Sequence, residues 1–155
     1  MTAFVILHYR AIDTTRSCVK SIRALAGDKH IVIVDNASPN GTGAVLAEEF
    51  APSPDVTVLL HGKNDGFARG NNVGTRWVCT HLDADFTVVL NNDVEIPQHD
   101  FIPQIAKIIN PESTLELPSL FTPLDDTVAI MLGSIALGCV QIITGMTISI
   151  VRKIQ

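Results

Sequence analysis

Two short stretches of the chain carry residue types that could bind phosphate or a metal ion. The first, HGKNDGFARGNNVG (residues 61–74), holds glycines at positions 62, 66, 70 and 74 together with three asparagines and an arginine. Glycine lets the backbone approach a ligand closely, and free N–H groups at the start of a helix favour an anion. We expect a helix to begin at Gly70 and Asn71, which predicts a contact with an anionic ligand. The alternative is a glycine-rich surface turn followed by a closely packed helix.

The second stretch is VVLNNDVEI (residues 88–96), in which an acidic residue follows an apolar run. Asp93, with Glu95 two residues on, could hold a hard divalent cation through oxygen ligands and leave positions for water and a diphosphate. The alternative is a turn formed by Asn92 and Asp93 before Pro97. The first interpretation makes Asp93 a candidate metal ligand.

The elements that must position these residues are four apolar runs rich in β-branched residues. They are AFVILH (3–8), HIVIVD (30–35), VTVLLH (56–61) and DFTVVLN (85–91). Their nearly continuous hydrophobicity is typical of strands buried on both faces. Helical segments lie between them: Asp13 can cap the first, and residues 43–50 and 71–82 form two more. This alternation predicts right-handed βαβ units, an α/β fold with a mostly parallel sheet flanked by helices.

Polar residues follow each of the four runs. Ligands of such sheets bind beyond the carboxyl ends of the strands, so these residues would converge on one crevice with carboxylates, amides, an aromatic ring and two arginines. They are His8, Tyr9 and Arg10 after the first run, Asp35, Asn36 and Ser38 after the second, residues 61–74 after the third, and Asn91, Asn92 and Asp93 after the fourth.

Composition narrows the class of protein. The chain has 155 residues, 46% of them hydrophobic, which suits one domain with a real core. A formal net charge of -5 with 11 scattered basic residues argues against nucleic-acid binding, so a phosphate-bearing ligand must be held by local devices. Cys18, Cys79 and Cys139 form no CxxC pair, which indicates reduced thiols of a cytosolic protein and no zinc site or disulfide framework.

Taken together, HIVIVDNASPNGT (30–42), NDGFARGNNVG (64–74) and VVLNNDVEI (88–96) resemble the N-terminal half of a family 2 glycosyltransferase with the Rossmann-like GT-A fold, close to its rhamnosyltransferase-like members. The motifs occur in the family's order and spacing. The resemblance implies a nucleotide-diphospho-sugar donor, UDP- or dTDP-linked, and a glycan or lipid-linked acceptor. The implied product is a cell-surface polysaccharide such as O-antigen or capsule.

The resemblance also implies roles for single residues. Asp35 would contact the base or ribose of the nucleotide. Tyr9 would pack near the base, although HYR departs from the usual pairing of Tyr with Asn. Asp93 would coordinate Mg²⁺ or Mn²⁺ at the DXD-type motif, which reads NND here, so its first acidic position is Asn91. The other implied donor contacts are Asn36, Asn64, Gly66, Arg69, Asn72 and Asn92, with Arg69 near the base or phosphates.

The chemistry implied by the resemblance leaves two functions open. A divalent ion bridging the phosphates would stabilise the departing nucleoside diphosphate, and inverting transfer also needs a base for the acceptor hydroxyl. The family has that base in its second half; nothing around Asp125 and Asp126 matches it, so we assign no catalytic residue. The chain is either a glycosyltransferase, alone or as part of a longer enzyme, or a nucleotide-sugar-binding module or truncated fragment without transfer activity. A third alternative is a doubly wound domain like a response-regulator receiver. It would explain an aspartate after a strand at position 35, but it would explain neither the glycine-rich loop nor the NND sequence.

After about residue 110 the alternation of strands and helices stops. We therefore expect a donor-binding half-domain (1–110), a proline-containing connector (111–127) and an apolar C-terminal segment (128–155), so that the fold is incomplete at its C-terminus. Residues 128–151 carry no charge, and a helix of that length would span roughly 36 Å against about 30 Å of hydrocarbon. The segment is a transmembrane helix, a pair of buried strands or an aberrant C-terminus. The expected location is the cytoplasm or the inner face of the membrane.

Overall fold

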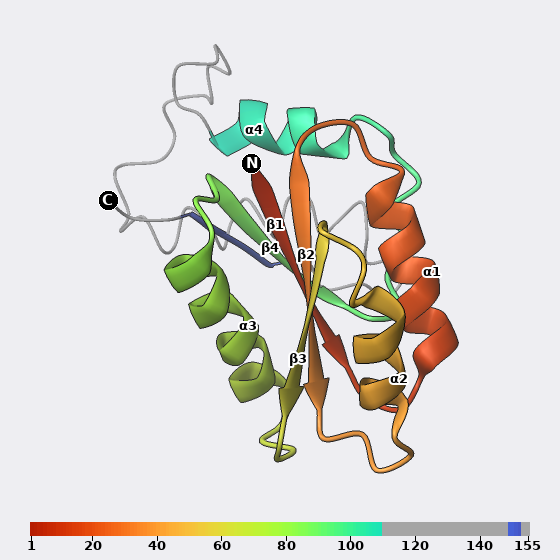
Figure 1. Ribbon diagram of the computed structural model, residues 1–155. Helices are drawn as coiled ribbons and strands as arrows, with labels where there is room; N and C mark the ends of the chain where they lie inside the picture. The colour runs from red at the N-terminus through yellow and green to blue at the C-terminus, as the bar shows by residue number, and fades with distance from the viewer. Residues whose placement is uncertain (110–148, 153–155) are drawn as a thin grey trace.

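The computed structural model describes residues 1–109 and 149–152 (Figure 1). Along the chain the elements are β1 (Thr2–His8), α1 (Ile12–Arg23), β2 (Lys29–Asn36), α2 (Thr42–Phe50), β3 (Val56–His61), α3 (Phe67–His81), β4 (Phe86–Asn91), α4 (Phe101–Ile109) and β5 (Ser149–Arg152). Each of the four predicted strands begins and ends within one residue of its predicted bounds. Helix α4 follows them as an element that the sequence pattern did not predict.

The strands form one sheet, which in the described part of the chain has the order β3-β2-β1-β4-β5. The β1–β2, β2–β3 and β1–β4 pairs are parallel, whereas β5 runs antiparallel to β4. This confirms the predicted mostly parallel sheet. The carboxyl ends of β1 to β4 therefore meet at one edge, the lower edge in Figure 1. Because β4 pairs with β1 and not with β3, the strand order reverses at β1, and open α/β sheets bind ligands at such a switch point.

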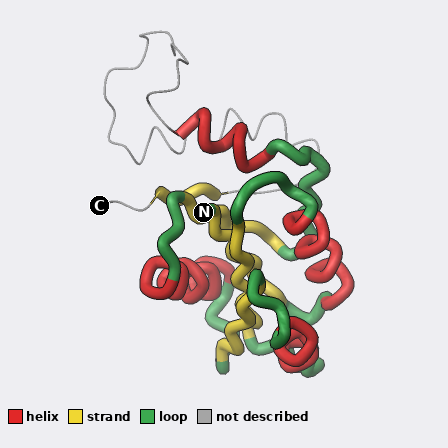
Figure 2. Tube along the Cα trace, turned by 45° about the horizontal axis from the view of Figure 1, so that its top comes forward, coloured by secondary structure: helices red, strands yellow, loops and turns green. Residues whose placement is uncertain are grey.

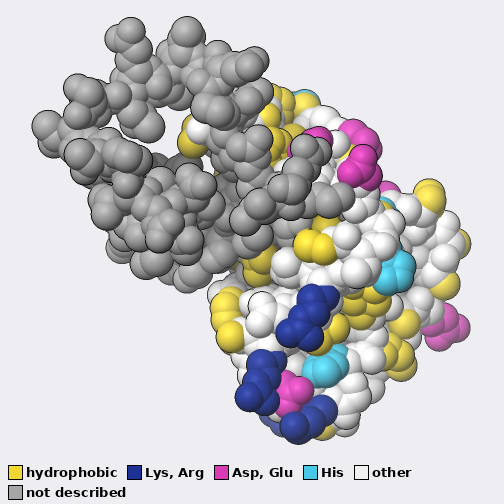
Figure 3. Space-filling model, turned by 90° about the vertical axis from the view of Figure 1, so that its left-hand side faces the viewer, with side chains coloured by type: hydrophobic (Ala, Val, Ile, Leu, Met, Phe, Trp, Pro, Cys, Tyr) yellow, Lys and Arg dark blue, Asp and Glu magenta, His cyan; other side chains and the backbone are white. Residues whose placement is uncertain are grey.

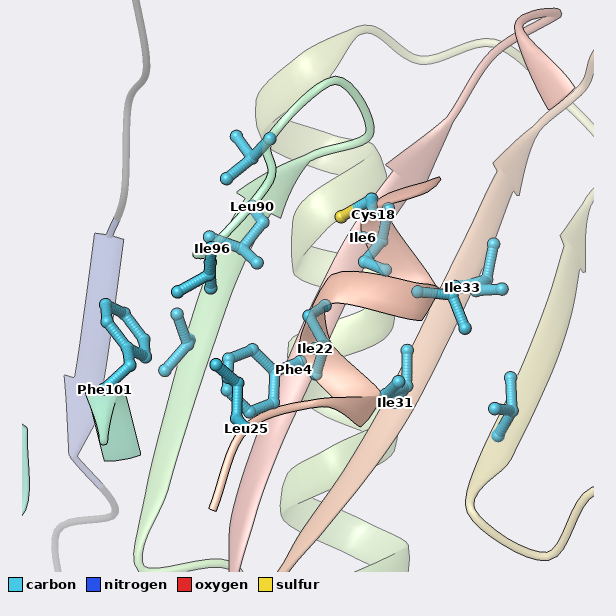
Figure 4. Close-up of a cluster of buried hydrophobic side chains, with 14 of the residues drawn as sticks. Phe4, Ile6, Cys18, Ile22, Leu25, Ile31, Ile33, Leu90, Ile96 and Phe101 are labelled. Atoms are coloured by element: carbon cyan, nitrogen blue, oxygen red, sulfur yellow. The ribbon is translucent and has the colours of Figure 1, made fainter. Parts of the chain in front are cut away.

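The sheet separates two hydrophobic clusters because alternate residues of a strand point to opposite faces. Phe4 and Ile6 of β1 belong to the cluster under α1, α2 and α4, whereas Val5 and Leu7 belong to the cluster that packs against α3. Figure 2 shows helices on both sides of the sheet. Figure 4 shows the first cluster, in which Ile22 of α1 lies over Phe4 and its neighbours on the strands. The two clusters hold the strands, and so their carboxyl ends, in fixed relative positions.

Helix α1 begins at Ile12, with Ala11 in the capping position. The Ala11 carbonyl accepts a hydrogen bond from the Thr14 hydroxyl at 2.9 Å, and Thr15 Oγ1 lies 3.0 Å from the same oxygen. Asp13 lies inside the first turn and pairs with Arg16 at 3.3 Å. The predicted capping role of Asp13 is therefore wrong. Its carboxylate still complements the positive end of the helix dipole.

Helix α3 begins at Phe67, four residues before the predicted start. Gly66 precedes it with a φ of 81°, which glycine adopts at no steric cost. The Gly70 N–H already donates to the Gly66 carbonyl at 3.1 Å, so it is not free for an anion. A Cβ on Gly70 would lie 2.5 Å from Leu7 Cδ1, and one on Gly74 would lie 2.5 Å from Val5 Cγ1. The prediction of a helix start at Gly70 is wrong, and these two glycines instead let α3 pack closely on the sheet.

The C-terminal predictions fall mostly outside the described residues. The connector (111–127) and residues 128–148 of the apolar segment are not described. Ser149–Arg152 of that segment form β5, which pairs with β4 through Phe86↔Arg152 to Val89↔Ser149. None of the helices within residues 1–109 has the length and apolar character needed to cross a bilayer.

Candidate functional site

The loop after β1 holds Arg10 in a backbone conformation that residues other than glycine rarely adopt. Its φ of 64° is in the left-handed region, which costs of order 1–3 kcal/mol and persists only where the surroundings enforce it. The Arg10 N–H donates to Ser38 Oγ at 2.9 Å, and the Arg10 carbonyl accepts from Asn40 Nδ2 at 3.0 Å. Tyr9 beside it is 38% exposed, with the Arg10 guanidinium 5.0 Å from its ring centroid. The loops after β1 and β2 are thus joined at the carboxyl edge.

Asp35 and Asn36 end β2 on opposite faces of the sheet. Ile33 belongs to the cluster under α1 and α2, so Asp35, two residues on, shares that face, whereas Asn36 shares the face of Val34 against α3. Both side chains are buried, with 7% and 3% exposed. The two predicted donor contacts therefore belong to different sides of the candidate site.

On the α1 and α2 side, the Asp35 carboxylate organises the loop after β2. Its two oxygens accept the Ser38 N–H at 3.2 and 3.3 Å. Gly43 of α2 lies so close that a Cβ there would overlap the carboxylate. The same loop holds Ala37 at a φ of 55°. Asp35 is accordingly fixed from two directions, and a substituent at position 43 would displace it.

On the α3 side, the structure brings together three of the predicted residues. Asn36 Nδ2 donates to Asn64 Oδ1 at 3.0 Å, and the same oxygen accepts the Gly66 N–H at 3.0 Å. The buried Asn36 Oδ1 accepts no hydrogen bond from the residues that the structure describes. These contacts tie the end of β2 to the turn that starts α3.

His8, at the end of β1, is fully buried and joins α1 to α2. Its Nδ1 lies 2.7 Å from Thr15 Oγ1, and its Nε2 lies 2.8 Å from Thr42 Oγ1. The Thr42 hydroxyl donates to Asn40 Oδ1 at 2.8 Å, so the network assigns the ring proton to Nε2. The pKa of His8 is lowered, because the effect of burial outweighs the opposing effect of the nearby Asp35 charge. The neutral ring therefore donates from Nε2 to Thr42 Oγ1, and its Nδ1 accepts the single Thr15 hydroxyl proton, which is then not donated to the Ala11 carbonyl.

The loop after β4 places Asn92 and Asp93 beside the start of α1. Asn92 Nδ2 donates to Thr15 Oγ1 at 3.1 Å and to Thr14 Oγ1 at 3.2 Å, so the amide nitrogen is occupied within the protein. Asp93 is exposed. It lines a shallow depression of about 200 Å³ together with Asp13, Thr14, Ser17 and Glu95. The carboxylate predicted as a metal ligand thus faces solvent at the carboxyl edge, on the α1 side.

The remaining predicted contacts, Arg69 and Asn72, are exposed on α3, and their side chains form no hydrogen bond or ion pair with the described residues. Lys63 pairs with Asp65 at 2.8 Å, and that carboxyl lies 3.2 Å from His61 Nε2. Lys63 and then His61 lower the pKa of Asp65. Lys and Arg side chains gather at the lower end of the face in Figure 3, where the parallel strands terminate. Local positive charge is therefore present at this edge of an acidic chain.

Three residues that connect the loops were not selected from the sequence. Thr15 and Thr42 lie in the first turns of α1 and α2, and Asn40 lies in the loop before α2. Each hydrogen bonds to a residue of another loop or strand. Hydroxyl and amide residues near helix starts are common as caps, so their position gave no signal of a shared contact with His8 or Arg10.

Relatives of known activity match part of the chain. A low-salt glycan biosynthesis hexosyltransferase of Haloferax volcanii is 26% identical over 98 residues, which cover 63% of this chain and 29% of that protein. An undecaprenyl-phosphate mannosyltransferase of Micrococcus luteus is 30% identical over 88 residues, which cover 52% of this chain and 36% of that protein. The chain therefore spans about a third of the length of these relatives.

Solved structures share the fold. A mannosyltransferase from Pyrobaculum calidifontis in complex with GDP-Man and Mn²⁺ superposes with a TM-score of 0.61 at 20% identity, over 71% of this chain and 32% of that chain. A fragment of TarS from S. aureus in complex with UDP gives a TM-score of 0.57 at 16% identity, over 70% of this chain and 31% of that chain. The sequence model of the family described as glycosyl transferase family 2 matches residues 3–152. The chain belongs to glycosyl transferase family 2 and has the Rossmann-like GT-A fold of its structural neighbours.

Proposed function

We propose that the chain binds a nucleotide-diphospho-sugar at the carboxyl edge of its sheet and serves inverting sugar transfer, alone or within a longer protein. The observation that carries this proposal is the convergence of the loops after β1, β2 and β4 beside the switch point. Tyr9 and Asp93 lie in these loops and Asp35 lies at the end of β2, and the chain belongs to a glycosyltransferase family. The neighbours solved with GDP-Man and with UDP support a donor of this class.

In this proposal Tyr9, Asp35 and Asn36 contact the nucleotide on the sheet side. Asn64 and Gly66 hold the turn before α3, and Arg69, Asn72 and Asn92 complete the donor contacts. The hydrogen bonds of Asn36 and Asn92 with neighbouring loops also hold those loops in place. The exposed Tyr9 ring is the surface on which a base would stack.

A divalent cation fits the residues of the loop after β4. Asp93, Glu95 and Asp13 supply carboxylate oxygens around one depression, the ligand type that Mg²⁺ and Mn²⁺ prefer. Within residues 1–109 and 149–152, no three His, Cys, Asp or Glu side chains stand close enough to form a complete metal cage. Asp93 would thus hold the cation jointly with the donor phosphates, where the ion supplies Lewis-acid stabilisation of the leaving diphosphate. The Mn²⁺ in the mannosyltransferase neighbour supports this choice.

The transfer step itself needs groups beyond those we assign. The acceptor hydroxyl oxygen forms a bond to the anomeric carbon, the bond from that carbon to the phosphate oxygen breaks, and its electron pair leaves with the nucleoside diphosphate. A carboxylate takes the hydroxyl proton; we assign this base to no described residue. We propose a glycan or lipid-linked acceptor, which the names of the hexosyltransferase and undecaprenyl-phosphate mannosyltransferase relatives support. The connector (111–127) and the membrane association of 128–151 stay predictions.

Calorimetric titration of the chain with UDP, GDP and dTDP, with and without Mn²⁺, tests the proposal. We expect one of them to bind, and Mn²⁺ to strengthen its binding at least about tenfold, which corresponds to about 1.4 kcal/mol. The Asp93→Asn variant loses this effect of Mn²⁺ because it removes the proposed ligand charge. The Glu48→Gln variant, which removes an exposed carboxylate on α2, is the matched control and keeps it.

The outcomes separate the two functions. If no nucleotide binds, or if Asp93→Asn responds to Mn²⁺ like the unchanged protein, the proposed donor site is wrong. Release of nucleoside diphosphate from a bound sugar donor in the presence of a glycan acceptor supports transfer by this chain. Binding without release favours the alternative, a nucleotide-sugar-binding module.

A further inference from the structure

Arg10 presents an unpaired guanidinium at the carboxyl edge of the sheet. Its side-chain nitrogens donate no hydrogen bond to the described residues, and no carboxylate of those residues pairs with it. Three other cations are paired: Arg16 with Glu49 at 2.7 Å, Arg23 with Asp55 at 2.7 Å and Lys63 with Asp65 at 2.8 Å. A free arginine beside a candidate site is available to an anion from solution.

The backbone at this position does not explain an arginine. At a φ of 64°, glycine or asparagine would be accommodated at lower cost. The hydrogen bonds that hold the loop use only the backbone N–H and carbonyl of Arg10, so Ser38 and Asn40 would hold any residue there equally well. The exposed side chain also adds nothing to either hydrophobic cluster. Its contribution must therefore come from the guanidinium.

The guanidinium is held in place by the neighbouring aromatic ring. Its Cζ lies 5.0 Å from the centroid of the Tyr9 ring, a cation–π contact that uses none of the N–H donors in a hydrogen bond with the described residues. Such a fork of donors matches two oxygens of a phosphate. Because the whole chain has a formal net charge of -5, a polyanionic ligand depends on cations placed at the site itself.

We propose that Arg10 is a donor-binding residue that contacts the phosphates of the nucleotide, beside a base stacked near Tyr9. The inference rests on the proposed function and deepens it, since it names which part of the ligand the loop after β1 recognises. Arg10 then selects nucleoside diphosphates over nucleosides, from the loop after β1, which Asn92 of the loop after β4 contacts through the Ala11 carbonyl at 3.4 Å. The strained backbone of the loop fixes the starting point of the side chain.

A ligand series of uridine, UMP and UDP, or the same series with the base that binds best, tests this role by calorimetry. We expect Arg10→Asn to weaken binding of the diphosphate about tenfold and binding of the nucleoside less than about twofold. Arg10→Lys, which keeps the charge but not the fork, falls between. Arg76→Asn is the matched control. Arg76 is also exposed and unpaired, but it lies nine residues after the start of α3, about 13 Å along the helix axis at 1.5 Å per residue and so away from the carboxyl edge. It leaves all three affinities unchanged.

Melting temperature supplies the second readout. Asparagine tolerates the left-handed conformation, so Arg10→Asn is expected to melt at the same or a higher temperature while it binds the diphosphate more weakly. A lower melting temperature with unchanged binding would overturn the inference in favour of a purely structural Arg10–Tyr9 contact. Equal losses for nucleoside and diphosphate would overturn the phosphate assignment. If the unchanged protein binds no diphosphate, the proposed function fails first; if it binds and Arg10→Asn binds equally well, only the role of Arg10 is wrong.

Discussion

At the scale of single residues, His8 connects more of the candidate site than any residue selected from the sequence. Its ring bridges Thr15 and Thr42, and Thr15 also receives the Asn92 amide from the loop after β4. Three loops at the carboxyl edge therefore depend on one buried imidazole. Because the neutral ring completes its hydrogen bonds without a charge, it can be buried at the end of β1 without an ionic partner.

This burial predicts a pH-dependent stability. The folded pKa of His8 is lowered by burial, while the unfolded chain binds the proton near the ordinary value of about 6.5. Below that pH the unfolded state binds more protons, so the free energy of unfolding falls as the pH falls towards the folded pKa. His30, whose pKa burial also lowers, acts in the same direction. Urea denaturation at pH 7.5, 6.5 and 5.5 measures the change.

The His8→Gln variant is expected to be less stable at pH 7.5 and to lose less stability on acidification than the unchanged protein. The exposed His99→Gln is the control and keeps the original pH dependence. Parallel curves for His8→Gln and the unchanged protein would show that His8 does not titrate differently in the folded state.

The sequence predicts those residues of the candidate site that lie at the end of a strand. It does not predict the residues that hydrogen bond to another side chain of the site. Asp35, Asn36 and Asp93 follow apolar runs, so period and run length were enough to place them at one edge. Thr15 and Thr42 are distant in the sequence, and both contact His8 only because two helices start beside this histidine. No local pattern encodes that contact.

At the scale of elements, helix α3 shows tertiary packing outweighing local preference. Its first turns contain two glycines, which disfavour a helix by roughly 1 kcal/mol each relative to alanine. The sequence pattern predicts a loop up to residue 70. The helix forms earlier because Gly70 and Gly74 bring its axis close to β1 and β2, where Val5, Leu7 and Val34 fill the space.

Gly74→Ala tests this packing. The new Cβ would lie 2.5 Å from Val5 Cγ1 and 2.8 Å from Val34 Cγ2, so we expect an overpacking cost of about 1–3 kcal/mol that exceeds the gain in helix propensity. Denaturant unfolding would show a lower midpoint. Gly62→Ala is the matched control: nothing lies within 4 Å of its added Cβ, and its stability stays within about 0.5 kcal/mol. A more stable Gly74→Ala would mean that α3 can move outward at little cost.

At the scale of the whole molecule, the net charge of the chain opposes a diphosphate ligand, whereas two arginines at the candidate site attract it. The chain has a formal net charge of -5, yet Arg10 and Arg69 have no carboxylate partner among the described residues. A donor diphosphate would thus be repelled by the net charge of the chain and attracted by these two arginines at the carboxyl edge. From the net charge, the sequence predicts that a phosphate-bearing ligand must be held by groups at the site itself. It does not indicate which cations remain unpaired.

This distribution predicts the sign of the salt effect on ligand binding. The screening length falls from about 10 Å at 0.1 M salt to about 3 Å at 1 M. If contacts with the site's cations dominate, raising NaCl from about 0.05 M to 0.5 M weakens diphosphate binding severalfold and leaves nucleoside binding nearly unchanged. If the net charge dominated, added salt would strengthen diphosphate binding. Calorimetry of UDP and uridine at both salt concentrations distinguishes the two signs.

Asp35 and Asn36, at the end of β2, point to opposite faces of the sheet. The number of residues in this strand therefore matters more for their placement than the identity of the apolar residues before them. β2 pairs with both β1 and β3. Loss of one residue within Ile31–Val34 would turn every following side chain to the other face: Asp35 would point to the α3 side and Asn36 to Gly43. Conservative apolar substitutions preserve this arrangement. Over evolutionary time we expect homologous chains to vary in sequence along β2 but to accept insertions and deletions only in the loops that flank it.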